Sequence, residues 1–264
     1  VSDHDRGQVS ASAAEVYDAF FVPALFDQWT DVVLDVADVR SGHRVLDVGC
    51  GTGVLARAAH VRVGARGHVA GVDPNDGMLT IARQAGPDIE WQTGLAEQLP
   101  YLDHSFDRTV SQFALMYFDD PEGALSEVCR VTGPEGRVAF AVWDRLDNNR
   151  GYARLATLVE DLFGSDAADA IRVPFQMGDP ETLLGLATTA LAEPTVTRHP
   201  GVARFETVQA WVHSEIRGWT LADSIDDHEF ATLLDAAQEQ LSDLAADSGV
   251  AFDVSALVCS GSTA

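Results

Sequence analysis

Short apolar runs recur along the first half of the chain and alternate with longer segments of helical periodicity. The runs predict five strands, at residues 44–48, 67–72, 89–92, 106–111 and 136–143. The first run is apolar almost without interruption, as a strand is when helices cover both faces of a parallel sheet. Strands that alternate with helices form such a sheet through right-handed crossovers. The pattern therefore predicts an α/β core within residues 37–146.

A helical segment rich in aromatic residues precedes this core, at residues 13–36. Its apolar side chains recur at three- and four-residue steps, and Pro23 is expected to break the helix. Most of these rings are expected to pack against the sheet. Two of them, Tyr17 and Trp29, are candidates to cover a bound ligand. Residues 1–10 are polar and are expected to be disordered.

Capping residues mark several helix boundaries. Asp120 and Asp179 each precede a proline, which predicts an N-cap followed by the first helical residue. Gly133 and Pro134 are expected to end the first of these two helices, as a C-cap glycine and a proline stop.

The rest of the chain is expected to complete one domain over residues 1–264. Two further strands are expected at residues 194–206 and 250–261. Helical periodicity dominates the segments 147–192 and 207–247, where the expected helices include residues 151–163, 207–217 and 227–246. The predicted fold is thus a seven-stranded, mostly parallel sheet with helices on both faces.

The charge balance excludes some classes of partner. The chain has 17 basic and 41 acidic residues, a net charge of −24, and contains no lysine. Such a surface repels phosphate backbones and anionic lipids, so we expect neither nucleic acid nor a membrane as partner. An acidic excess without lysine favours a host with high internal salt, where screening relieves the self-repulsion.

The cysteines and the apolar runs indicate the compartment. Cys50, Cys129 and Cys259 are odd in number and lack metal-site spacing, so we expect reduced thiols and no metal. A charged leader and an apolar run of membrane-spanning length are not apparent, and a cytoplasmic protein is expected. A monomer and a homodimer both remain open.

Three glycines at alternate positions follow the first strand. In the segment 45–53, Gly49, Gly51 and Gly53 allow a turn with positive φ and the close approach of a ligand to the main chain. The next helix then offers free N–H groups at its N-terminus. A loop of this kind at the end of a first strand is typical of nucleotide-binding α/β proteins. Cys50 lies inside it, either as a small turn residue or as a reactive thiol.

Two acidic residues narrow the choice of nucleotide. Asp73 ends the second strand, where a carboxylate can accept both hydroxyls of a ribose; alternatively, it caps a helix before Pro74. Asp47, inside the first strand, is foreign to the dinucleotide fingerprint, and Val54 occupies the place of that fingerprint's third glycine. A nicotinamide cofactor is therefore disfavoured.

Five segments together resemble the class I S-adenosylmethionine-dependent methyltransferases, in the branch around the ubiquinone/menaquinone biosynthesis C-methyltransferases. The segments are residues 45–53, 71–79, 94–100, 105–107 and 127–137. The resemblance implies a Rossmann-like fold, S-adenosylmethionine as cofactor and S-adenosylhomocysteine as product. It also implies that the helices before the core and those inserted after the fifth and sixth strands form a substrate cap.

The same resemblance implies a cofactor site. Asp47 would face the cofactor's ammonium group, and Asp73 would bind the ribose hydroxyls. The glycine loop would lie against the methionine part, and Ser111 and Gln112 would face the site of methyl transfer. The full implied set is Asp47, Gly49, Cys50, Gly51, Gly53, Asp73, Pro74, Asn75, Met78, Leu95, Ala96, Glu97, Ser111 and Gln112.

Leu95 departs from the family pattern, which often has an acidic residue there to accept from the adenine amino group. One hydrogen bond, worth about 1 kcal/mol, would be lost or taken over by Glu97.

The implied reaction is an in-line methyl transfer to a small molecule, in which holding the nucleophile in line supplies much of the catalysis. A general base is needed only if the acceptor must lose a proton. His213, Tyr17 and Tyr117 are candidates, each more easily explained as structural, and no base is assigned. The segment 111–114 is not the Asp-Pro-Pro-Tyr-like segment of amino-methylating nucleic-acid enzymes, so a small neutral or cationic acceptor is expected.

Two other functions remain as alternatives. One is a relative of the same fold that binds the cofactor without ordinary methyl transfer. The other is a nicotinamide-dependent oxidoreductase, which the position of Val54 disfavours.

Overall fold

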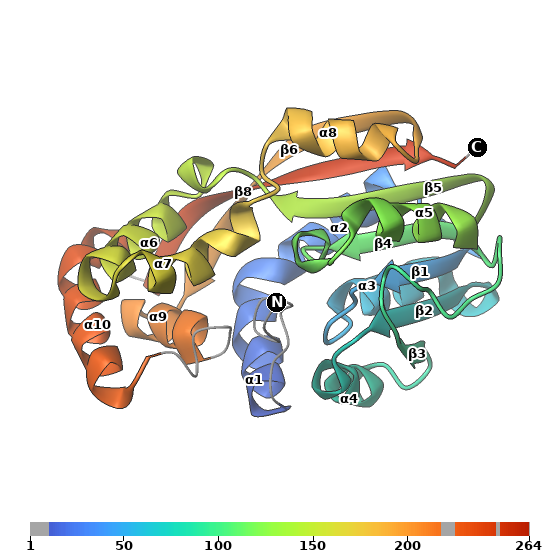
Figure 1. Ribbon diagram of the computed structural model, residues 1–264. Helices are drawn as coiled ribbons and strands as arrows, with labels where there is room; N and C mark the ends of the chain where they lie inside the picture. Colours follow the sequence, from blue (N-terminus) through green and yellow to red (C-terminus); the bar gives the residue numbers. More distant parts are fainter. Residues whose placement is uncertain (1–10, 218–224, 247–248, 264) are drawn as a thin grey trace.

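The computed structural model describes residues 11–217, 225–246 and 249–263 (Figure 1). The segment 1–10, for which we expected disorder, lies outside these residues. Seven strands form one sheet in the order β3-β2-β1-β4-β5-β8-β6, and the short β7 (Ala245–Ala246) pairs with β8. The strands are β1 (Arg44–Val48), β2 (His68–Asp73), β3 (Glu90–Thr93), β4 (Phe106–Gln112), β5 (Thr132–Trp143), β6 (Ala192–Phe205) and β8 (Gly249–Ser262).

The sheet is mixed, as the sequence predicts. The strands from β3 to β5 pair in parallel, whereas β8 lies between β5 and β6 and is antiparallel to both. The strand order reverses at β1, which pairs with β2 on one side and β4 on the other. In open α/β sheets, ligands bind beyond the carboxyl ends of the strands at such a point.

Helices cover both faces of the sheet (Figure 1). Asp120 caps its helix as predicted, since it accepts from the Gly123 N–H. The helix after Pro74 is capped by Asn75, which accepts from the Met78 N–H, and not by Asp73, the residue that the sequence offered as its cap. Asp179 likewise caps its helix, as expected. The helices that pack on the sheet are α2 (Thr30–Val36), α3 (Val54–Val63), α4 (Asp76–Ala85), α5 (Pro121–Val131) and α8 (Pro180–Thr188).

The N-terminal segment stays helical through Pro23, so the predicted break is wrong. The chain passes from α1 (Ala11–Val16) into a π-helix, η2 (Tyr17–Phe26), and reaches α2 through the single turn η3 (Asp27–Trp29). Pro23 lies inside η2. A proline lacks the N–H that an α-helix needs in its interior, and a wider turn accommodates that loss.

Two other boundaries differ from the predictions. Gly133 is not a C-cap, because α5 ends in the extended Thr132, which already pairs with Phe106 of β4. A bulge then carries the chain past Gly133 and Pro134 before regular pairing resumes at Arg137. The helix predicted over residues 227–246 ends earlier, since α10 is Asp227–Gln240.

Four helices gather at one end of the sheet, where two of them pack against β8 and one of these two also contacts η2 (Figure 1). One of them, α7, was not predicted. They are α6 (Arg150–Phe163), α7 (Ser165–Arg172), α9 (Val208–Arg217) and α10. By contrast α8, inside the segment 147–192 that we assigned to the cap, packs against β6, β8 and α5. The division into a core at 37–146 and a cap remains a prediction.

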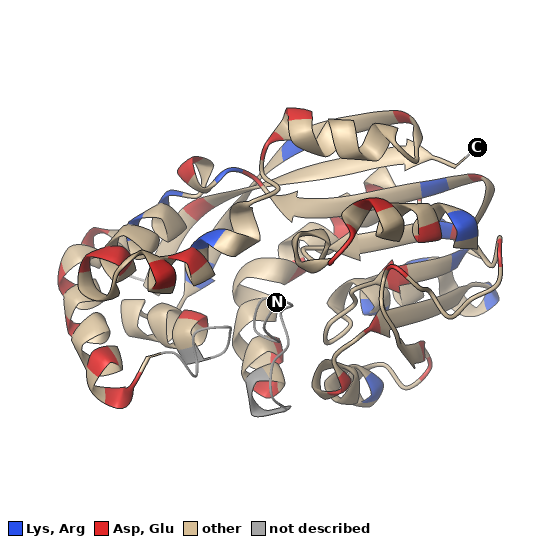
Figure 2. Ribbon diagram, in the orientation of Figure 1, with Lys and Arg blue, Asp and Glu red and all other residues tan. Residues whose placement is uncertain are grey.

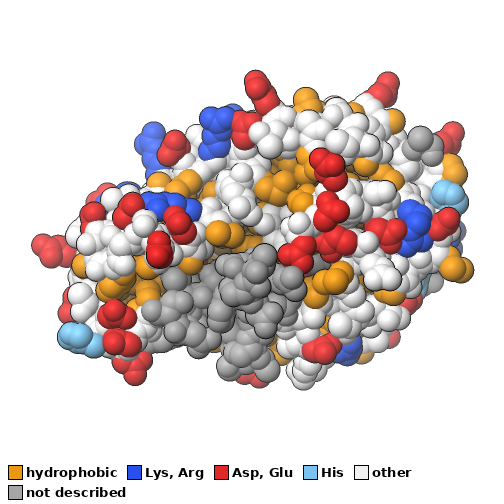
Figure 3. Space-filling view, viewed as in Figure 1, with side chains coloured by type: hydrophobic (Ala, Val, Ile, Leu, Met, Phe, Trp, Pro, Cys, Tyr) orange, Lys and Arg blue, Asp and Glu red, His pale blue; other side chains and the backbone are white. Residues whose placement is uncertain are grey.

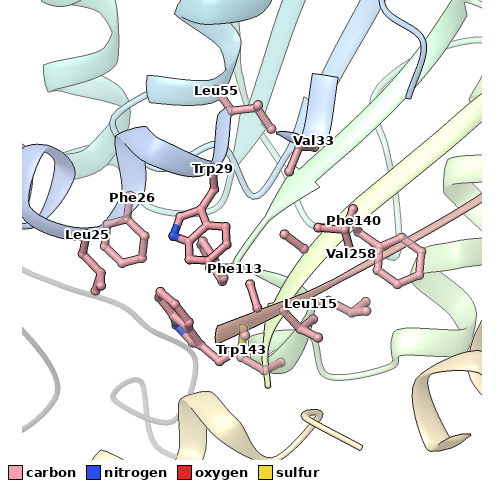
Figure 4. Packing of buried hydrophobic residues seen from close by; sticks show 14 of the residues in the cluster. Leu25, Phe26, Trp29, Val33, Leu55, Phe113, Leu115, Phe140, Trp143 and Val258 are labelled. Carbon is pink, nitrogen blue, oxygen red and sulfur yellow. The ribbon is translucent and has the colours of Figure 1, made fainter. Parts of the chain in front are cut away.

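An aromatic cluster fills the space between η2 and the sheet (Figure 4). Phe113 stacks on Trp143 with ring centroids 4.0 Å apart, and Trp29 meets both rings edge-on. Only 1% of Trp29 is exposed, so the prediction that it covers a ligand is wrong. Edge-on and stacked arrangements of such rings are favoured, and through Trp29 they hold η3 against the end of β5.

Within the described residues, none of the helices combines the length and the apolar character that a membrane-spanning helix requires.

Candidate functional site

A cavity of about 310 Å³ opens at the carboxyl ends of β1, β2 and β4, where the strand order reverses. Side chains from η2 and from the loops after these strands complete it. Its lining residues are Tyr17, Asp47, Gly49, Cys50, Gly51, Thr52, Val54, Leu55, Asp73, Pro74, Met78, Gly94, Leu95, Ala96, Glu97, Gln112, Phe113, Ala114, Tyr117, Phe118 and Asp119.

Asp73 occupies the end of β2 and faces this cavity. Its Oδ2 accepts the Gly51 N–H and its Oδ1 accepts the Asn75 N–H, both at 2.8 Å. Burial raises the pKa of Asp73 to about 6, although the two N–H donors oppose that shift. Each carboxylate oxygen has two lone pairs, so both oxygens can still accept a hydroxyl from a ligand.

Asp47 is the most deeply buried charged group of the cavity wall, with 1% of its surface exposed. Neither carboxylate oxygen has a hydrogen-bond partner within the described residues. Burial raises its pKa to about 8; the nearby backbone N–H of Ala56 opposes that shift, and Asp73 adds to it. An unpaired carboxyl is costly in such a place unless a ligand completes it, and a cationic ligand suits it best.

The three glycines of the loop have different surroundings. Gly49 and Gly51 line the cavity with φ of 69° and 53°. A Cβ on Gly51 would touch nothing within 4 Å of the protein, so the space beside it is open to a ligand. Gly53 does not line the cavity; its missing Cβ makes room for the ring of Trp91, 2.3 Å from where that atom would lie.

Ser111 and Gln112, which we expected to face the same ligand, are adjacent residues of β4, and their side chains point to opposite faces of the sheet. Gln112 lines the cavity and donates to the Phe26 carbonyl at 3.2 Å. Ser111 does not: it lines a small apolar cavity beside α5 instead. Successive side chains of a strand point to opposite faces, so adjacent residues cannot both face one ligand. Asn75 is also absent from the lining, because its side chain caps α4.

The loop after β3 forms the far wall. Ala96 and Glu97 line it beside Leu95, whose side chain is 50% exposed. The Glu97 carboxylate accepts the Asp120 N–H at 3.2 Å, which fixes it at the rim.

Cys50 lines the cavity as a free thiol. Burial raises its pKa well above the ordinary value, and Asp73 and Asp47 add to the shift. A thiol of this kind is mostly protonated at neutral pH, so the structure favours a small turn residue over a reactive one.

Two of the three candidate bases reach the cavity. Tyr17 and Tyr117 line it, whereas His213 is exposed on α9 and lies edge-on to the ring of Phe230, 5.7 Å away. Burial raises the pKa of Tyr17 far above its ordinary range, so its hydroxyl stays protonated. A phenol that keeps its proton can donate a hydrogen bond but cannot act as a base.

Several lining residues carried no signal in the sequence. Phe113 has a φ of 55°, an uncommon conformation for a bulky residue, and this turns the chain sharply after β4. Ala114 and Phe118 follow it along the cavity wall. A left-handed phenylalanine has no sequence signature, since glycine or asparagine usually marks such a turn.

Within the described residues, no three His, Cys, Asp or Glu side chains are grouped so that they could hold a metal ion.

The comparisons with known proteins agree with this geometry. A family model described as a methyltransferase domain matches residues 46–140. The demethylmenaquinone methyltransferase of Paenarthrobacter aurescens strain TC1 is 37% identical over 114 residues, 43% of this chain and 44% of the relative. A ubiquinone/menaquinone biosynthesis C-methyltransferase from Chromobacterium violaceum is 35% identical over 132 residues, 48% of this chain and 54% of its own. The chain thus spans about half the length of the relatives it matches.

Solved structures show the same fold over more of the chain. The YcgJ protein from Bacillus subtilis covers 89% of this chain and 98% of its own, with a TM-score of 0.60 and 22% identity. Phosphoethanolamine N-methyltransferase 2 of Haemonchus contortus covers 99% and 60%, with a TM-score of 0.63 and 17% identity. Residues 46–140 thus match the model of a methyltransferase domain, and the chain shares its fold with these solved structures.

Proposed function

We propose that the protein transfers the methyl group of S-adenosylmethionine, in line, to a small-molecule acceptor. The observation that carries the proposal is the unpaired, buried carboxyl of Asp47 in the wall of the cavity beside the glycine loop. S-adenosylmethionine offers an ammonium group and a sulfonium, and it supplies an activated methyl group when bound. The residues present fit such a cation.

The charge of the cavity supports a cationic ligand throughout. Its described lining includes Asp47, Asp73, Glu97 and Asp119 but no arginine or histidine. A cavity of one sign concentrates ligands of the other sign. No arginine or histidine of this lining could pair with an anionic acceptor, which favours an acceptor that is neutral or cationic.

Different residues of the cavity bind different parts of the cofactor. Asp73 holds the ribose hydroxyls and fixes the glycine loop through Gly51. Asp47 holds the ammonium end, and the open space at Gly51 lets the ligand approach the main chain. Tyr17, from η2, and the aromatic wall beside it exclude water from the side that faces the cap. Rigid placement of the two reactants is the main source of catalysis in such a transfer.

The outer surface supports the choice of a small molecule over a nucleic acid. Acidic residues are spread over the core and the cap (Figure 2), and the space-filling view shows acidic side chains scattered over the visible face (Figure 3). The protein's net charge of −24 would repel a phosphate backbone at long range.

Calorimetric titration with S-adenosylmethionine, S-adenosylhomocysteine and NAD tests the cofactor. We expect binding of the first two and none of NAD; binding of NAD alone would overturn the proposal. A screen of neutral and cationic acceptors for S-adenosylhomocysteine release then tests the transfer. Tight cofactor binding without release by any acceptor would favour the alternative, a relative that binds the cofactor without ordinary methyl transfer.

A further inference from the structure

A second, narrower cavity of about 50 Å³ lies between η2 and the cap helices, and we call it the aromatic chamber. Tyr17 and Tyr117 line both cavities, so the two spaces meet at these side chains. Seven of the chamber's lining residues carry aromatic rings. The lining residues are Tyr17, Phe21, Leu25, Phe26, Tyr117, Trp143, Tyr152, Ala170, Ile171, Pro174, Phe175 and Glu215.

Glu215, on α9, is the one charged side chain in the described lining of the chamber. Its Oε1 accepts the Tyr152 hydroxyl at 2.7 Å and the Trp211 indole N–H at 3.3 Å. Both of these hydrogen bonds go to the same oxygen. The other carboxylate oxygen therefore has lone pairs to offer to a group that enters the chamber.

Asp144 and Glu215 differ in their partners, because only Asp144 forms an ion pair within the described residues. Asp144 is fully buried and pairs with the Arg198 guanidinium at 2.6 Å, with Ser255 and Asn148 as further donors. Glu215 has no ion-pair partner in the part of the chain that the structure describes. A carboxylate set among aromatic rings without a cation is costly to the fold, and ligand binding is a usual reason for retaining one.

We propose that the aromatic chamber receives the end of the methyl acceptor that carries an O–H or N–H group, that Glu215 binds this group, and that the rest of the acceptor extends past Tyr17 and Tyr117 into the larger cavity. This proposal rests on the proposed methyltransferase function. It narrows the acceptor to a molecule with a hydrogen-bond donor and no negative charge. The rings select a flat, apolar body, and they also attract an ammonium group if the donor is an amine.

The ionisation of Glu215 fits this role. Burial raises its pKa to about 7, while the Tyr152 and Trp211 hydrogen bonds oppose the shift. Near neutral pH a substantial fraction of the side chain is therefore ionised, and a donor that enters the chamber favours that form. The other titratable groups facing it from packed elements are Tyr17, Tyr117 and Tyr152, and burial raises the pKa of Tyr17 and Tyr152.

Four small probes test the chamber in the protein saturated with S-adenosylhomocysteine. Phenol and benzylamine carry a donor, toluene has the same ring without one, and benzoate is an anion. Titration calorimetry at pH 8 compares the wild type with Glu215→Gln and with Glu239→Gln, an exposed glutamate on α10 that serves as the matched control.

We expect the wild type and Glu239→Gln to bind phenol or benzylamine at least about tenfold more tightly than toluene and benzoate. In Glu215→Gln that preference is lost, whereas the affinity for S-adenosylhomocysteine changes by less than about twofold. The tighter of phenol and benzylamine indicates whether the chamber prefers a hydroxyl or an amine as the donor. Unchanged donor binding in Glu215→Gln, or benzoate as the tightest probe of the wild type, would overturn the proposal.

The cofactor titration separates this proposal from the one on which it rests. If the wild type fails to bind S-adenosylhomocysteine, the methyltransferase function fails; if only the donor preference is missing, the chamber proposal fails. Should Glu215→Gln not fold, Tyr152→Phe serves instead. It removes a hydrogen bond that stabilises the ionised carboxylate, so donor binding should require a higher pH than in the wild type. An unshifted pH profile would contradict the proposal.

Discussion

Asp73 accepts the backbone N–H of Gly51 at 2.8 Å, across 22 residues of sequence. One side chain thus ties the end of β2 to the loop that follows β1. The same carboxylate holds the start of α4 through the Asn75 N–H. The shape of the glycine loop and the proposed ribose contact therefore depend on a single residue.

We predict that Asp73→Ala loses about a hundredfold in affinity for S-adenosylhomocysteine, because two charge-assisted hydrogen bonds at about 1.5 kcal/mol each disappear. Circular dichroism should show an intact fold. The matched control is Asp76→Ala, three residues further on, where an exposed carboxylate accepts only from Thr93 among the described side-chain bonds. Normal binding by Asp73→Ala would refute the assignment of this residue.

Substitution of three glycines by alanine should separate binding from folding. Gly51→Ala keeps the fold at a cost of about 1 kcal/mol for positive φ, but it loses cofactor affinity because the methyl group enters the cavity. Gly42→Ala, with a φ of 87° and open space around it, has the same backbone cost without the loss of affinity. Gly53→Ala should destabilise the fold most, since its Cβ collides with Trp91.

Thermal melts and titrations of the three variants check this prediction. Equal cofactor affinity in Gly51→Ala and Gly42→Ala would mean that the ligand does not approach the loop.

The free energy of unfolding of the ligand-free protein should fall as the pH rises from 6 to 8.5. Asp47, Asp73 and Glu215 have pKa values of about 8, 6 and 7, all raised by burial. A carboxyl with a raised pKa holds its proton in the folded state at a pH where the unfolded chain has released it. The unfolded state therefore binds fewer protons, and stability decreases with pH through this window.

Urea denaturation across this pH range measures the slope. Asp47→Asn should flatten it near pH 8, because the neutral amide does not titrate. A slope that is zero or positive in the wild type would count against the buried, proton-holding carboxyls.

Salt should stabilise the protein. The net charge of −24 destabilises the compact state through self-repulsion, and the Debye length shortens to about 3 Å in molar salt. We expect the melting temperature to rise between low and molar KCl, as it would for a protein from a high-salt host. A melting temperature that stays flat or falls would exclude that interpretation.

Local patterns in the sequence were enough to predict the core of the fold. Strand β1 has the predicted bounds, and Asp120 and Asp179 cap helices where their side chains and the following prolines require it. These features depend on near neighbours in sequence, which the chain displays directly. The position of the candidate site also followed, because the glycine loop and Asp73 are local motifs at strand ends and both line the cavity.

Features that depend on distant neighbours could not be predicted. Gly53 is required because the ring of Trp91 fills the space that a Cβ would occupy. The turn after β4 depends on Phe113, which adopts a left-handed conformation and packs on Trp143. On α9 the sequence offered His213 as a candidate base, yet Glu215 is the residue of that helix that lines the chamber. Two helical residues that are two positions apart lie on roughly opposite sides of the helix, so the choice depended on the packing of α9 against η2.

The position of β8 has a consequence for the order in which the chain folds. Because β8 separates β5 from β6, the edge strand β6 has no place in the sheet until β8 is present. The parallel strands from β3 to β5 can pair during synthesis, whereas the last two positions of the sheet are filled only after residue 262 has been made. Glu215 lies between β6 and β8 in sequence, so the chamber can be completed only after the strands that carry the cofactor site have been synthesised.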